Sequence, residues 1–314
     1  MKKMILIFVM IFSGCTSNFS PNGPYRQQLV VYAVLDGNTA TQIIRVYGTF
    51  SPDEYDPLQP SPNKEIQNAS VSVYDGQLTY NFHDTTIIVK NGNAVNRSVH
   101  TYVNYYFQPV EKQQYTLHVV AQGFDTSTAV ITSISFGDIL PGNINTLTKP
   151  GQEKTIPIRV ALGANVRAFL PMVSFEYEVN NDGVQRTREV PIQIAKNEFG
   201  EVTKKFFPKI SFRDASSNLT GSYETISFDT DAYLATALEI KKEYAGMTVK
   251  IRTAVLSLVQ FDNSLYTYYS VANNFAGGAT LRLDEPDYTN INNGFGVFGM
   301  QNKEVKVYGL PADF

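Results

Sequence analysis

Alternating apolar and polar residues dominate the first half of the chain and predict a series of short β-strands. Residues 29–35 (LVVYAVL) and 41–50 (TQIIRVYGTF) flank the sequence DGN, in which Gly and Asn accept the positive φ of a tight hairpin turn. In residues 69–76 (ASVSVYDG), valines alternate with serines before a second turn. Turn signals recur about every ten residues, which is typical of an antiparallel sandwich. We therefore predict an N-terminal β-sandwich over residues 29–134.

Residues 155–314 combine further strand patterns with two helical segments. Near residues 231–245, apolar residues at 4-3-4 spacing form a single stripe and predict an amphipathic helix. These residues are Tyr233, Ala237, Ile240 and Tyr244. A shorter helix is predicted over residues 263–275 (NSLYTYYSVANNF). Residues 135–154 contain five glycines and prolines and little periodicity, so we expect a linker between two domains there.

The composition agrees with a mainly β fold. The chain has 19 Tyr and 20 Phe, no Trp, and many β-branched residues, which favour half-buried pleated surfaces. We predict two antiparallel β-sandwich domains, the first Ig- or transthyretin-like and the second fibronectin-III-like, with one or two short helices in the second.

The N-terminus has the pattern of a secretory signal. After MKK, the apolar run Met4–Phe12 is nine residues long, whereas a membrane-spanning helix needs about 20. The box FSGC ends at Cys15, and cleavage in front of a cysteine is typical of bacterial lipoprotein signals. We expect residues 1–14 to be removed, Cys15 to carry the lipid, and residues 15–28 to form a polar tether.

Cysteine content and charge exclude several classes of function. Cys15 is the only cysteine, so the chain has no intramolecular disulfide, and once it is lipidated no thiol is left for catalysis. The formal net charge is −3 and no basic run occurs, which argues against nucleic-acid binding. Lipid chains would hold the protein on a membrane. Because no acidic cluster follows Cys15, we favour the periplasmic face of the outer membrane slightly over the cell surface.

Catalytic patterns are weak throughout. The three histidines, His83, His100 and His118, are separated by 17 and 18 residues, without the paired local spacing of metal sites. We interpret them as strand-surface residues. A G-x-S-x-G nucleophile elbow does not occur in the sequence. We therefore expect a protein that is not an enzyme and needs no cofactor.

Two acidic clusters in predicted loops offer a calcium site or a general acid/base pair as alternatives to solvated loop charge. They are Asp53, Glu54 and Asp56, and Asp284, Glu285 and Asp287. Neither cluster has the regular spacing of a known calcium loop, so we prefer solvated charge. The second cluster stays a weak metal candidate because it borders a glycine-rich segment.

Two groups of tyrosines are weak candidates for ligand binding, because tyrosine stacks on sugar rings and is enriched at protein interfaces. The first group is Tyr102, Tyr105 and Tyr106, and the second is Tyr266, Tyr268 and Tyr269. The alternative is that strand alternation turns half of such a group into the core. The ligand itself is not indicated by the sequence.

The glycine-rich segment 290–299 (NINNGFGVFG) lacks the G-x-x-x-x-G-K-[ST] pattern of a phosphate loop, and no helix is predicted after it. We interpret it as a structural turn with Phe295 and Phe298 reaching the core. Together with an I-x-N-A-x-V strand at 66–71 and a Y-T-L-x-V strand at 115–119, this ending resembles a family of Bacteroidota lipoproteins catalogued as domain of unknown function 4249.

The resemblance implies a lipid-anchored, largely β protein of the outer envelope, commonly encoded beside TonB-dependent transporters. It brings no catalytic residues. The Pro-rich loop 51–63 departs from the family's pattern, and the sequence gives it no role. Our leading hypothesis is a non-enzymatic binding or accessory protein that serves an outer-membrane transporter. The alternative is a structural surface adhesin or fimbria-like subunit that assembles through exposed strand edges.

Overall fold

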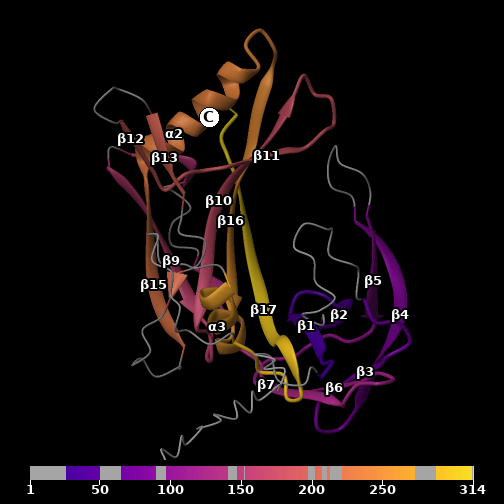
Figure 1. Cartoon of the computed structure of the whole chain (residues 1–314). Helices are drawn as coiled ribbons and strands as arrows, with labels where there is room; N and C mark the ends of the chain where they lie inside the picture. Colours follow the sequence, from indigo (N-terminus) through magenta and orange to yellow (C-terminus); the bar gives the residue numbers. More distant parts are fainter. Residues whose placement is uncertain are drawn as a thin grey trace, which may run out of the picture.

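The computed structural model is mainly β, with helices α2 (Thr230–Glu243) and α3 (Asn263–Ala272) in its second half, which confirms the predicted fold class (Figure 1). No helix of the described residues is long and apolar enough to cross a bilayer. The structure describes residues 26–49, 65–89, 97–140, 147–151, 153–196, 202–206, 211–212, 221–272, 288–312 and 314.

One 12-stranded sheet runs through both halves of the chain. Strands β10, β16 and β17 form one part of it, and strands β1 to β7 form the other. In spatial order the strands are β11 (Arg186–Glu189), β10 (Ala168–Val179), β16 (Val249–Phe261), β17 (Gly294–Gly309), β1 (Leu29–Asp36), β2 (Gln42–Gly48), β5 (Arg97–Asn104), β4 (Thr79–Val89), β3 (Ser70–Tyr74), β6 (Gln114–Val120) and β7 (Ser127–Thr132), while β14 (Ser211–Phe212) pairs with β10.

The two halves of the sheet meet at a parallel strand pair. β1 runs alongside the first half of β17, from Leu29 opposite Gly294 to Asp36 opposite Gln301, and the other described strand pairs are antiparallel. The prediction of purely antiparallel sandwiches is therefore wrong at this pair. Parallel neighbours need a long connection, and here nearly the whole chain lies between the two strands, so local patterns could not reveal the pairing.

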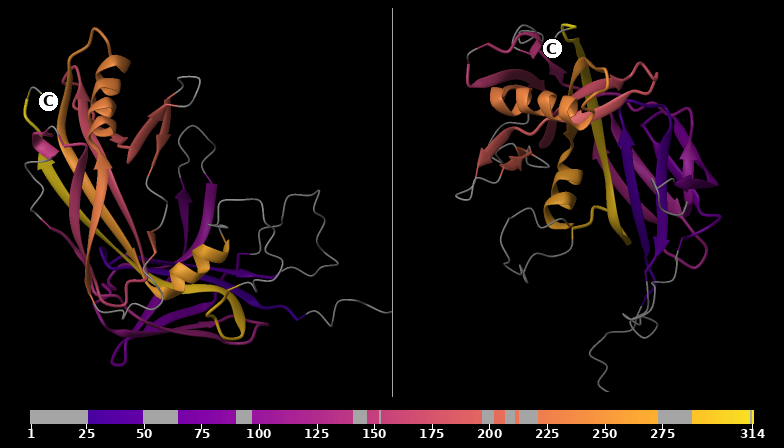
Figure 2. Two further views of the ribbon diagram at one scale, coloured as in Figure 1. Left: turned by 90° about the vertical axis from the view of Figure 1, so that its left-hand side faces the viewer. Right: turned by 90° about the horizontal axis from the view of Figure 1, so that it is seen from above.

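The sheet bends sharply where β17 meets β1, giving two limbs with α3 in the angle between them (Figure 2). We call β1 to β7 the N-terminal limb. The C-terminal limb contains β10, β16 and the second half of β17, covered by a three-stranded sheet of β15 (Ser222–Asp229), β9 (Thr155–Leu162) and β8 (Asp138–Ile139). Helix α2 and the hairpin of β12 (Gln193–Lys196) and β13 (Val202–Lys205) lie at the far end of this limb (Figure 1).

Each limb has its own hydrophobic core, and both cores include residues outside the domain ranges expected from sequence. Phe298 and Met300 come from the predicted C-terminal domain but lie in the N-terminal core. Ile139 and Leu147 come from the predicted linker but lie in the C-terminal core. The limbs are therefore tied together by shared strands and are not joined only by a linker.

The amphipathic stripe of α2 packs as its spacing predicts. Tyr233, Ala237 and Ile240 are buried in the C-terminal core, and Gly246 follows the helix with a φ of +87°. A left-handed glycine just past the last turn is a common way to end a helix. The helix predicted over 263–275 is α3.

Candidate functional site

Residues 294–299 of the glycine-rich segment belong to the first half of β17, so the interpretation of the segment as a turn is wrong for these residues and holds only just before them, at Asn293. The glycines of the segment let backbones approach closely: a Cβ on Gly294 would lie 2.8 Å from the Leu29 carbonyl oxygen, and one on Gly296 only 2.1 Å from that of Val31. Gly296 also has a φ of +104°, which an L side chain rarely adopts. Phe298 is buried as expected, whereas Phe295 is 41% exposed.

Asparagines before β17 fasten this half of the strand to its surroundings. The Asn290 amide donates to the Phe298 carbonyl at 2.7 Å and accepts from the Phe298 N–H at 2.9 Å, as a neighbouring strand would. Asn292 exchanges backbone hydrogen bonds with Thr128 on the edge strand β7. The family-like motif thus forms a structural joint between the limbs.

Helix α3 is seated on this joint through a buried carboxylate. Asp262 precedes the helix and accepts a 2.8 Å hydrogen bond from the Leu265 N–H. Burial raises the pKa of Asp262 to about 7, although the backbone N–H groups of Leu265, Met300 and Ser264 oppose the shift. The helix approaches β17 so closely that a Cβ on Gly299 would lie 2.5 Å from the Leu265 Cγ.

The position of α3 in the angle creates a connected aromatic surface that links the N-terminal limb to α3. Ring centroids are 6.1 Å apart between Tyr47 and Tyr32 and between Tyr32 and Tyr268, and 5.7 Å apart between Tyr268 and Tyr269. The Arg45 guanidinium lies 5.1 Å from the Tyr47 ring centroid, which is within cation–π range. We call Tyr32, Tyr47, Tyr266, Tyr268 and Tyr269 the elbow tyrosine surface.

The elbow tyrosines are partly exposed, so part of each ring is accessible to a ligand. Tyr32 is 36% exposed, and the other four are half-buried. Burial raises the pKa of Tyr268 to about 12, with a further contribution from Tyr32, so this hydroxyl stays protonated at neutral pH. Arg167 lies over the Tyr266 ring at 5.4 Å and adds positive charge to the surface. Aromatic rings beside arginines are suited to contacts with sugars, peptides or another protein.

The six tyrosines predicted from sequence have different fates. Tyr266, Tyr268 and Tyr269 are brought together on α3. Tyr102 is fully buried, its hydroxyl donating to the Ile66 carbonyl and accepting from the Ala69 N–H, so its assignment to ligand binding is wrong. It points into the N-terminal core because strand alternation directs it there. Tyr105 and Tyr106 are 53% and 90% exposed after β5 and share no ring contact with the elbow tyrosines among the described residues.

Tyr32 and Tyr47 were missed by sequence reasoning. Each lies in a predicted strand at a position opposite to the core-facing residues, and Tyr32 pairs across β1 and β2 with Arg45. The alternation shows only that these tyrosines face away from the core. Their role depends on the position of α3, which is more than 200 residues away in the chain.

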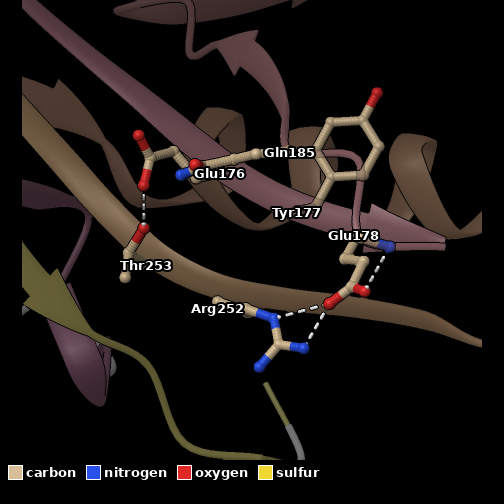
Figure 3. A pocket seen from close by; sticks show the side chains of 7 residues that line it. Glu176, Tyr177, Glu178, Gln185, Arg252 and Thr253 are labelled. Atoms are coloured by element: carbon tan, nitrogen blue, oxygen red, sulfur yellow. Dashed lines mark hydrogen bonds and ion pairs between the residues drawn. The ribbon is translucent and has the colours of Figure 1, made fainter. Parts of the chain in front are cut away.

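A polar cavity of about 270 Å³ lies at the far end of the C-terminal limb (Figure 3). A bulge between β10 and β16 opens it, because the pairing skips Arg252 and turns both Arg252 and Thr253 toward the carboxylates of β10. Glu178 accepts from Arg252 and from the Gly183 N–H, and these bonds lower the pKa of Glu178. Glu176 accepts from the Thr253 hydroxyl at 2.8 Å. Arg252 balances the charge of Glu178, whereas Glu176 is paired only with a neutral hydroxyl.

The histidines do not assemble a metal site. His83 and His118 are exposed on strands as predicted, whereas His100 is buried and its Nε2 contacts Asp84 Oδ1. His100 was expected at a strand surface, so that expectation is wrong. No group of three or more potential ligands occurs among the described residues.

Several candidates fall outside the residues that the structure describes. They are the lipidation site Cys15 with the signal and most of the tether, the Pro-rich loop 51–63, and the acidic cluster Asp284, Glu285 and Asp287. Their assignments remain predictions from sequence.

The chain matches a known protein family. A profile described as domain of unknown function DUF4249 matches residues 16–306, which covers nearly the whole chain, including both limbs and α3. The chain belongs to this family. No curated protein matches it. The resemblance drawn from the glycine-rich ending is thereby confirmed, and the structure assigns that ending to the joint between the limbs.

Proposed function

We propose that the protein is a non-enzymatic envelope lipoprotein that binds a partner or ligand through the elbow tyrosine surface. In this proposal it is an accessory component of a TonB-dependent transporter of the outer membrane, on whose periplasmic side it is held by the lipid on Cys15. The observation that carries the binding role is the connected run of half-exposed tyrosines from β2 and β1 to α3. Tyrosines of the N-terminal limb and of α3 meet at the angle between the limbs and form one contact area.

Capture from envelope membranes tests the role. Wild-type protein carrying its lipid is used to recover bound proteins from detergent-solubilised membranes, beside a Tyr32→Ala, Tyr268→Ala double variant. Tyr223→Ala serves as the matched control, because Tyr223 is 65% exposed but lies on β15, outside the elbow. We expect wild type and control to recover a TonB-dependent barrel and the double variant to lose it. Equal recovery by all three proteins would contradict a role for the elbow.

The anchor is tested separately from the binding surface. A Cys15→Ala variant should no longer fractionate with membranes, because a protein without acyl chains loses the hydrophobic anchor. Protease treatment of intact cells should leave the wild-type protein intact if it faces the periplasm. Release of the protein by external protease would place it on the cell surface instead.

A structural subunit, adhesin or fimbria-like, is the second candidate. The observation that favours it is an unpaired edge on β17, since subunits of such assemblies join by adding strands. Polymers of the purified protein would support this candidate over the accessory role.

A further inference from the structure

The two halves of β17 differ in what lies beside them. Gly294–Gln301 pair with β1 and Gln301–Gly309 pair with β16, so the two neighbouring strands overlap only at Gln301. On the other side of the first half, the Phe298 backbone is bonded to the Asn290 side chain. Figure 1 shows the half of β17 nearer the C-terminus with a neighbouring strand on one side only. A free strand edge in a long sheet is the feature that natural proteins usually cover or charge.

The first outward-facing backbone groups beyond β1 are hydrogen-bonded to a side chain. Lys303 directs its N–H and carbonyl away from β16, and both are bonded to the Asn38 amide, at 2.5 and 2.6 Å. The Asn38 side chain therefore takes the position beside β17 that follows the end of β1. Because alternate residues of a strand direct their backbone groups to the same side, the next groups on this side belong to Val305, Val307 and Gly309. No described residue bonds to them on that side.

Side chains beside these groups favour an apolar neighbour. Val305 is 43% exposed and Val307 is 58% exposed, on one face of the strand. On the opposite face Lys306 is paired with Asp138 at 2.8 Å, so its charge is already balanced. N–H and C=O groups at alternate residues, to which no described residue bonds and which exposed valines flank, match the backbone of an extended polypeptide.

We propose that the edge Glu304–Gly309 of β17 is a docking site at which an extended segment of a partner protein adds a strand, in line with β1. The segment pairs over about five residues, between the Asn38 amide and Pro311, and places β-branched or aromatic side chains beside the two valines. This inference stands apart from the transporter assignment, since it specifies how a partner binds and not which partner it is.

A second copy of this chain fits the edge poorly when the two β17 edges pair with each other. Two-fold pairing that sets Val307 opposite Val307 also sets Pro311 of the copy opposite Lys303, whose backbone is already bonded to Asn38. The neighbouring register, with Lys306 opposite Lys306, sets Gly309 of the copy opposite Lys303, whose backbone groups are bonded to Asn38. A single extended segment meets neither obstacle.

Proline substitution tests the site through the backbone alone. Val307→Pro removes only an outward N–H, because the ladder to β16 is formed by the alternate residues Lys306 and Tyr308. Val307→Thr keeps the N–H and the β-branched shape and is the matched control. Val305→Pro is a second, independent variant in case Val307→Pro fails to fold, which circular dichroism will show.

The variants are compared by capture from solubilised envelope membranes with the full-length lipidated protein. We expect a protein that is retained by wild type and by Val307→Thr at equal yield and is reduced at least tenfold by either proline. In the recovered complex the Val305 and Val307 amides should become protected from hydrogen exchange. Equal capture by the proline variants, no captured protein, capture only of a second copy, or unchanged exchange at these amides would overturn the proposal.

Discussion

The two halves of β17 show how one strand can serve two purposes. In the first half, Gly294–Gln301, buried glycines and apolar residues pair with β1 and pack against Asn290 and α3, and they hold the limbs together. In the second half, charged residues alternate with exposed valines and one side is open. The comparison teaches that the glycine-rich motif has an architectural role. The second half of β17, which has no distinctive motif, presents backbone N–H and C=O groups to which no described residue bonds.

The largest difference is expected for alanine at a glycine in each half. Gly296→Ala should destabilise the protein by about 5 kcal/mol or prevent folding, since its Cβ overlaps the Val31 oxygen and its φ is positive. Gly309→Ala should change the free energy of unfolding by less than about 0.5 kcal/mol, because no atom lies within 4 Å of the added Cβ. Chemical denaturation of both full-length variants measures the difference, and similar losses would refute the assignment of the joint.

The pH dependence of the free energy of unfolding should also arise mainly beside the first half of β17, at Asp262. The folded-state pKa of Asp262 is about 7, above its ordinary value of 3.8, so the folded protein holds a proton that the unfolded chain releases. Stability is then greatest below about pH 4 for this group and falls as pH rises to 7, by up to about 4 kcal/mol.

Unfolding of the wild type and of Asp262→Asn at several pH values between 4 and 8 tests this. The asparagine variant should lose the decline between pH 4 and 7. Asp138→Asn, which removes the exposed partner of Lys306 in the second half, should leave the decline in place. A decline that persists in Asp262→Asn would show that another group causes it.

Proline at neighbouring positions should separate the two sides of the second half. Lys306→Pro removes a ladder bond to β16 and should cost about 3 kcal/mol, because it also leaves a carbonyl of β16 without a donor. Val307→Pro should cost less than about 1 kcal/mol. Thermal unfolding compares the two, and a larger loss for Val307→Pro would mean that the open side has been assigned to the wrong residues.

The smallest contrast is between two asparagines that mimic strands. Asn290→Ala removes two partly buried hydrogen bonds to Phe298 and should cost about 2 kcal/mol. Asn38→Ala removes two exposed bonds to Lys303 and should cost less than about 1 kcal/mol. It should also lengthen the open edge by one residue pair, which faster exchange of the Lys303 amide would reveal.

Sequence patterns predicted local structure well where a single face is buried. The alternation at residues 29–35 and the stripe of Tyr233, Ala237 and Ile240 both arise from burial on one side, so periodicity alone is sufficient. The strand at residues 294–299 was not predicted because its glycines are required by tertiary contacts. A Cβ at position 296 would collide with the Val31 carbonyl oxygen of β1. The sequence around Gly296 does not indicate that β1 is its neighbour.

The candidate site could be predicted only in part for the same reason. Tyr266, Tyr268 and Tyr269 were found because they cluster in sequence. Tyr32 and Tyr47 became part of the surface only through the pairing of β1 with β17 and the seat of α3 on it. The sequence suggested exposed strand edges as one alternative but did not locate them, because the position of the open edge depends on where β1 ends.

Residue-resolved hydrogen exchange along β17 in the isolated full-length protein tests the central claim most directly. The account predicts slow exchange from Val297 to Gln301, since these residues pair with β1 on one side and Asn290 accepts from the Phe298 N–H on the other. In the second half it predicts slow exchange at Lys306 and Tyr308 and fast exchange at Val305 and Val307. Uniformly slow exchange from Glu304 to Tyr308 would contradict an open edge, and uniformly fast exchange before Gln301 would contradict the joint.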